Sequence, residues 1–124
     1  MRNYINKAPK NTLRVLANDD LAPNYGKAKY KATFPDGRKV TFITDDTTRQ
    51  VLDTLIKRPV YCASLVRVGH YVDVLRDELG NEAIRTDWIK PTKPRQKAHG
   101  VYSIACKVEH MQNISSQTNV GIQL

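Results

Sequence analysis

The chain has 124 residues, 40% of them hydrophobic, which is enough for one modest core and therefore for a single domain. Lys and Arg number 20 against 12 Asp and Glu, and the net charge of +8 favours a polyanionic partner, nucleic acid or an anionic membrane surface. Such a charge can also serve solubility alone, and we favour nucleic acid over that alternative. Two cysteines without CxxC spacing exclude a disulfide framework. In the absence of a long apolar stretch or a secretory leader, we expect a reduced, cytoplasmic protein with no membrane contact.

Residues 1–26 are predicted to form a basic arm, a short helix and a loop. The segment "NTLRVLANDD", residues 11–20, has Leu13 and Leu16 at a spacing that suits the inner side of a helix. "LAPNYG" after it is typical of a loop. The cations of the arm are Arg2, Lys7 and Lys10.

Residues 27–44 carry the clearest strand pattern, that of a β-hairpin. "KAKYKATF" alternates lysine with small or apolar residues, and a period of two puts the two kinds on opposite faces. "PDG" supplies the turn, because Pro fixes φ, Asp caps locally and Gly tolerates positive φ. This cationic face either follows a phosphate backbone, forms a solvated sheet face, or guards a sheet edge against aggregation, and the sequence leaves all three open. Its lysines are Lys27, Lys29, Lys31 and Lys39.

Three helices are predicted after the hairpin. The first, at 45–58, has acids at its start, cations at its end and an apolar stripe between them. A short helix over 62–68 follows, and Gly69 separates it from a stronger helix over 70–79. The residues that recur at helical intervals in this last part are Val68, Val72, Leu75 and Leu79.

Two predicted strands, 83–89 and 101–108, flank a loop at 90–100 that contains two prolines and no acid. The prolines keep such a loop extended and reduce the entropy lost on docking. The polar residues 109–124 have little pattern and form a predicted tail. The cations of the loop are Lys90, Lys93, Arg95 and Lys97.

The predicted elements follow the order of a winged helix-turn-helix: helix, short helix, glycine turn, helix, strand, cationic loop and strand. We therefore predict an α+β fold in three parts: a basic arm and β-hairpin over 1–44, a winged helix-turn-helix of three helices and a wing over 45–108, and the tail over 109–124. Over about residues 46–106 the chain resembles small winged helix-turn-helix DNA-binding proteins encoded by phages and prophages. The residues that carry the resemblance are Gly69, Leu75-Arg76, Gly80 and Ile84-Arg85-Thr86.

The resemblance implies binding of double-stranded DNA by the third helix and the wing, in a phage or prophage transcriptional regulator. Asp73 and Asp77 on that helix would repel phosphates, so the helix would enter at its N-terminal end or the other basic elements would supply the affinity. The implied DNA-binding residues are His70, Tyr71 and Arg76 on the helix, Lys90, Lys93, Arg95 and Lys97 in the wing, and Lys27, Lys29 and Lys31 in the hairpin.

Two other functions compete with DNA binding. A small phage protein that inhibits a host protein with the same fold would suit the acidic residues of the third helix. RNA binding by the hairpin is less favoured, because its aromatic residues Tyr30, Phe34 and Phe42 fall on the apolar side.

No motif of the sequence indicates an enzyme. Cys62 has no recognisable base or orienting group, and no phosphate-binding glycine loop is present. His70, His99 and His110 lack the spacing of metal ligands. We expect no cofactor, no metal and no catalysis, and a monomer or a homodimer.

Overall fold

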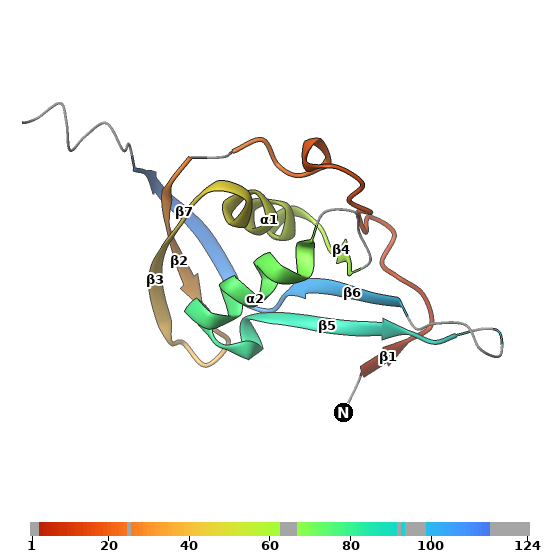
Figure 1. Cartoon of the computed structure of the whole chain (residues 1–124). Helices are drawn as coiled ribbons and strands as arrows, with labels where there is room; N and C mark the ends of the chain where they lie inside the picture. The colour runs from red at the N-terminus through yellow and green to blue at the C-terminus, as the bar shows by residue number, and fades with distance from the viewer. Residues whose placement is uncertain (1–2, 25, 63–66, 92, 94–98, 115–124) are drawn as a thin grey trace, which may run out of the picture.

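Two α-helices and seven strands make up the part of the chain that the computed structural model describes, residues 3–24, 26–62, 67–91, 93 and 99–114 (Figure 1). Single 3-10 turns occur in addition at Asn18–Asp20 and Asn81–Ala83. In chain order the elements are β1 (Asn3–Ile5), β2 (Ala28–Thr33), β3 (Lys39–Thr44), α1 (Asp46–Lys57), β4 (Val60–Tyr61), α2 (Val68–Leu79), β5 (Ile84–Ile89), β6 (His99–Ile104) and β7 (Lys107–Asn113).

The strands form two sheets, one ordered β1-β5-β6-β4 and the other β3-β2-β7. All neighbours are antiparallel except β1 and β5, which are parallel. Only Ala105 and Cys106 separate β6 from β7, so the chain passes almost directly from one sheet into the other. Figure 1 shows both helices in the angle between the sheets, with β2, β3 and β7 at one end of the molecule.

The core fills this angle between the sheets. Side chains from both helices and both sheets are completely shielded from solvent there, and one continuous cluster contains them all. The largest of them are Tyr30, Leu52, Leu75, Ile84, Val15, Val51, Val60, Val68 and Val72.

Helix α1 is buried around most of its circumference, because seven consecutive residues, Arg49 to Leu55, are buried. The loop before β2 covers its polar side: the Ala22 N–H donates to Thr54 Oγ1 at 2.9 Å, and Gln50 Nε2 donates to the Ala22 carbonyl at 3.0 Å. The apolar stripe predicted for this helix is therefore correct, but its polar face is also part of the interior. Among the helices of the described ranges, none is long and apolar enough to cross a membrane.

The predicted winged helix-turn-helix is wrong. The described residues contain two helices rather than three, and Val60–Tyr61, just before the expected short helix, forms strand β4 against β6. Pro59 ends α1, and a β-branched and an aromatic residue follow it, which favours extended backbone. Residues 63–66 of the predicted helix lie outside the described residues. The predicted wing strands do pair, but β5 and β6 are the central strands of a four-stranded sheet.

The helix predicted over residues 11–20 is also wrong. Leu13 instead pairs in parallel with Val60: the Leu13 N–H donates to the Pro59 carbonyl and the Tyr61 N–H to the Leu13 carbonyl, both at 2.9 Å. This long-range pairing overrides the weak local helix signal. By contrast, the predicted hairpin and the helices at 45–58 and 70–79 are confirmed as β2–β3, α1 and α2.

Candidate nucleic-acid interface

The side of the β3-β2-β7 sheet that points away from the helices carries most of its lysines. On β2, Ala28, Tyr30 and Ala32 are fully buried on the inner side, whereas Lys29 and Lys31 between them are partly exposed on the outer side. The register places Lys31 between Thr41 and Glu109, and Thr33 between Lys39 and Lys107. We call the following residues the lysine face: Lys27, Lys29, Lys31, Lys39 and Lys107.

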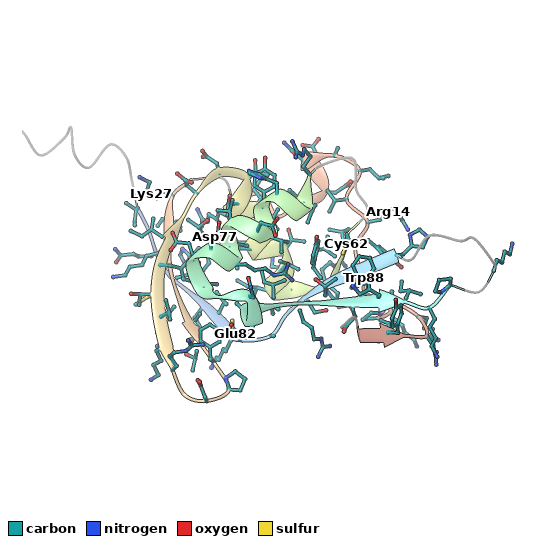
Figure 2. The ribbon with its side chains drawn as sticks, turned by 60° about the horizontal axis from the view of Figure 1, so that its bottom comes forward. Arg14, Lys27, Cys62, Asp77, Glu82 and Trp88 are labelled. Atoms are coloured by element: carbon teal, nitrogen blue, oxygen red, sulfur yellow. The ribbon has the colours of Figure 1, made fainter. Side chains whose placement is uncertain are left out.

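The positive charge of the lysine face is hardly neutralised within the molecule. Lys107 Nζ lies 4.0 Å from a Glu109 oxygen, and both side chains are exposed. Among the described residues, no other lysine of this face takes part in an ion pair. In Figure 2 the labelled Lys27 lies at this end of the molecule, far from Arg14 and Trp88. The face is therefore a local source of positive potential.

Arg76, an expected DNA-binding residue, is instead part of the structure. Its Nη2 donates to the Ile84 carbonyl at 2.7 Å and to Thr86 Oγ1 at 2.9 Å, and its guanidinium lies over the Tyr102 ring. These contacts join α2 to β5 and β6. The remaining nitrogen, Nη1, lies 3.9 Å from Asp73 Oδ1, so the guanidinium is engaged mainly within the protein.

The exposed surface of α2 is acidic. Asp73, Asp77 and Glu78 are exposed, and Figure 2 labels Asp77 on α2. His70 is exposed, and its ring meets the half-buried Tyr71 ring edge-on with 5.1 Å between centroids. Three carboxylates beside a single imidazole give this helix a surface that repels phosphates.

Of the cations of the predicted wing, Lys90 lies away from the lysine face. Lys90 and Lys93 are exposed, whereas Arg95 and Lys97 lie outside the described residues. Lys90 directly follows β5, and Figure 1 shows the end of β5 at the opposite end of the molecule from β2 and β3. Lys90 and the lysine face therefore do not form one continuous surface.

Beneath the lysine face, a buried polar cluster joins α1 to β2 and β7. The Tyr30 hydroxyl donates to Asp53, and Arg49 Nε donates to the Tyr30 oxygen at 3.0 Å and lies 3.6 Å from Asp53 Oδ2. Arg49 Nη1 donates to the Gly26 carbonyl at 2.9 Å, and Nη2 donates to Asn113 Oδ1 at 2.8 Å. Each nitrogen of the guanidinium thus has a partner inside the protein.

A pocket of about 380 Å³ opens beside this cluster, between α1 and β7. Arg49 and Asp53 direct their polar atoms at each other and at neighbouring protein groups, so they offer the pocket no free base or nucleophile. We interpret the cluster as a structural clamp that fixes the sheet on α1. The pocket is lined by Asn24, Tyr30, Arg49, Asp53, Ile56, Lys57, Val108, His110 and Asn113.

The cysteines have the properties of packing residues. Burial raises the pKa of the Cys62 thiol, and burial likewise raises the pKa of the Cys106 thiol, so both favour the protonated, weakly nucleophilic form. Within the described residues, no group of three or more His, Cys, Asp or Glu side chains could hold a metal ion.

Raising the pH is expected to destabilise the clamp through Tyr30. Burial, with the hydrogen bond to Asp53, raises the pKa of Tyr30 from 10.0 to about 12. The folded state therefore holds the hydroxyl proton of Tyr30 more tightly than the unfolded state. The stabilisation that this provides is complete below pH 10 and is lost between pH 10 and about 12. At most about 2–3 kcal/mol of the free energy of unfolding would be lost over this range.

Urea unfolding of the wild type and of Tyr30→Phe across pH 9 to 12 would measure this loss. The variant lacks the titrating group, so its stability should fall less steeply, while the titration of the lysines is common to both proteins. Equal slopes for the two proteins would contradict the raised pKa.

Sequence reasoning missed two features of this region. The basic surface expected from the sequence omits Lys107, although the alternation Lys107-Val108-Glu109 indicates a strand with Val108 inward. Arg49 and Asp53 stand four residues apart on a helix, a spacing that allows an ion pair, but the sequence does not show that both are buried.

Comparisons of the chain with models of known protein families, with curated proteins and with solved structures found no match. The resemblance to phage-encoded DNA-binding proteins stays a prediction, and the two-sheet architecture contradicts the fold that it implied. Function must therefore be inferred from the charges and geometry of this chain.

Proposed function

We propose that the protein binds double-stranded DNA through the lysine face, by neutralising phosphates and without reading base edges. The observation that carries the proposal is the group of four lysines on one side of one sheet, with Lys27 directly before β2, and Glu109 is the one carboxylate on this side among the described residues. Each lysine that approaches a phosphate releases a counterion, and this electrostatic attraction supplies most of the affinity of non-specific DNA binding.

The arrangement of the lysines suits a phosphate backbone. Lys29 and Lys31 lie two residues apart on the central strand, roughly 7 Å along it, and the neighbouring strands bring Lys39 and Lys107 to either side at a strand spacing of about 5 Å. Several ammonium groups can therefore approach one backbone at the same time. Because their stems are flexible, these contacts do not depend on sequence.

The same face argues against single-stranded nucleic acid. Proteins that bind single strands commonly stack bases on exposed aromatic rings. The described residues of the outer side include no aromatic ring, since Tyr30 and Phe42 are buried on the inner side. The uncharged outer residues are Thr33, Thr41, Ile43 and Gln112.

A second function, inhibition of a host protein by direct binding, is favoured by the acidic surface of α2. Asp73, Asp77 and Glu78 are exposed beside Val74, whose exposed fraction is 37%. A basic partner protein would be attracted to this surface and DNA would be repelled. A partner retained from a nuclease-treated host lysate by the wild type, but not by Asp73→Asn/Asp77→Asn, would favour this function.

Titration of a short random-sequence duplex and of a single strand of equal length tests the DNA-binding proposal. We expect the duplex to bind more tightly, and the logarithm of the binding constant to fall linearly with the logarithm of the salt concentration, with a slope of about −4. Fluorescence anisotropy at several salt concentrations would measure both. A slope flatter than about −1, or tighter binding of the single strand, would be incompatible with the proposal.

A further inference from the structure

Strand β3 is an unprotected edge of the β3-β2-β7 sheet. Among the described residues its backbone hydrogen bonds all belong to the ladder with β2. The opposite edge strand, β7, is interrupted by an irregularity in its pairing with β2 at Lys29/Tyr30, and such irregularities discourage further pairing. β1, at the edge of the other sheet, has three residues. β3 is therefore the long, regular edge that another strand could extend.

The hairpin register fixes which backbone groups of β3 point outward. The Phe34 N–H donates to the Arg38 carbonyl at 2.9 Å, so these residues form the hydrogen-bonded pair that closes the hairpin. Hydrogen-bonded and non-hydrogen-bonded pairs alternate along an antiparallel ladder. Lys39, Thr41 and Ile43 are therefore in non-hydrogen-bonded pairs with β2, and their N–H and C=O groups point to the free edge.

We propose that two copies of the chain dimerise by antiparallel pairing of their β3 strands, centred on Thr41. This register pairs Thr41 with its symmetry mate, Lys39 with Ile43 of the other copy, and Val40 with Phe42 of the other copy. All three outward-pointing residues then make ladder hydrogen bonds, about six in total. Of the outward residues, Ile43 gains most from a partner, because 51% of its surface is exposed in the single chain.

This register also avoids repulsion between like charges. Lys39, the one charged residue of β3, stands opposite an isoleucine instead of its own mate. The two Lys39 residues are then four positions apart along the strands, roughly 13 Å, which is beyond the screening length of about 8 Å at physiological salt. A register that paired Lys39 with its mate would place two ammonium groups side by side.

The dimer would carry one continuous basic surface. The twofold axis that relates two antiparallel strands is perpendicular to the sheet, so both copies present the lysine face on the same side. The two three-stranded sheets would then form one sheet of six strands, with two copies of the lysine face on the same side. Dimerisation itself does not depend on the proposed DNA binding, because it is measured without nucleic acid.

Sedimentation velocity over a range of protein concentrations, without nucleic acid, tests the proposed dimer. The wild type is expected to associate as a dimer. Ile43→Lys places an ammonium group opposite Lys39 of the other copy twice per dimer, and we expect it to raise the dissociation constant about tenfold. Thr41→Pro removes an outward N–H without touching the ladder to β2, and is expected to give a monomer.

Thr41→Val is the matched control, because it keeps both the outward N–H and a β-branched side chain, and it should dimerise like the wild type. Circular dichroism would establish that each variant is folded, and Ile43→Lys keeps the test valid should Thr41→Pro fail to fold. A wild type that sediments as a monomer at all concentrations would overturn the proposal. So would Ile43→Lys dimerising as tightly as the wild type.

Discussion

Replacing four residues of the lysine face, Lys29, Lys31, Lys39 and Lys107, with alanine is expected to weaken duplex DNA binding by roughly two orders of magnitude at low salt. Each lysine–phosphate contact contributes about 0.9 to the slope of log K against log salt, so the slope should flatten by about 3 to 4. If these lysines supply most of the contacts, little salt dependence would remain. Anisotropy titrations of the same duplex at several salt concentrations would measure both quantities.

A matched control separates the lysine face from net charge. Alanine at Lys7, Lys10, Lys57 and Arg58 removes the same amount of positive charge from exposed positions outside the β3-β2-β7 sheet. This variant should keep most of the slope, because long-range attraction is screened over about 10 Å at 0.1 M salt. Equal losses in the two variants would show that general charge, and not this surface, binds the duplex.

The double variant Lys90→Ala/Lys93→Ala measures the contribution of the loop after β5. A loss of duplex affinity larger than that of the four-lysine variant would show that the residues after β5, and not the lysine face, bind the duplex. We expect a smaller loss, because the lysine face presents its charges together on one sheet.

Local patterns were enough to predict the hairpin and both helices. The alternation in "KAKYKATF" and the turn at Pro35–Gly37 fix β2 and β3 within a few residues, and Gly37 has the positive φ that the turn requires. The sequence could not reveal the pairings between distant segments. Three pairings join residues far apart in the chain: β1 with β5, Leu13 with Val60, and β2 with β7. A period-two pattern predicts a strand but does not identify the strand with which it pairs.

The prediction of a winged helix-turn-helix is wrong because the sequence does not reveal these long-range strand pairings. The order of elements after residue 45 is compatible with that fold until β4 and β1 are placed beside β6 and β5. Arg76 illustrates the same difficulty for the site. As the cation of an amphipathic helix it is a reasonable DNA contact, but the carbonyl of Ile84 accepts its hydrogen bond once β5 packs under α2.

The lysine face depends on the polar clamp beneath it. Tyr30 lies on the inner side of β2, directly between Lys29 and Lys31, and its hydroxyl meets Asp53 and Arg49 of α1. The clamp therefore holds the central strand of the sheet in place. A buried ion pair of this kind is weak evidence of net stabilisation, but losing one partner leaves the other buried and uncompensated.

Replacing Arg49 with methionine is therefore expected to destabilise the protein by about 3–5 kcal/mol. The exposed fraction of the Arg49 side chain is 7% and that of Asp53 is 10%, so the Asp53 carboxylate would lose its cation in a largely buried position. The Gly26 carbonyl and Asn113 would also lose a donor. Urea unfolding near neutral pH would measure the change in the free energy of unfolding.

Two further variants make this stability prediction specific. Arg38→Met removes an arginine whose ion pair with Glu82 is about half exposed on both sides, and it should have little effect, because solvent-exposed pairs stabilise little. Arg49→Met combined with Asp53→Leu removes both charges of the clamp and should cost less than Arg49→Met alone, because no buried charge is left unpaired. If the double variant is no more stable than the single one, the loss arises from packing and not from an uncompensated carboxylate.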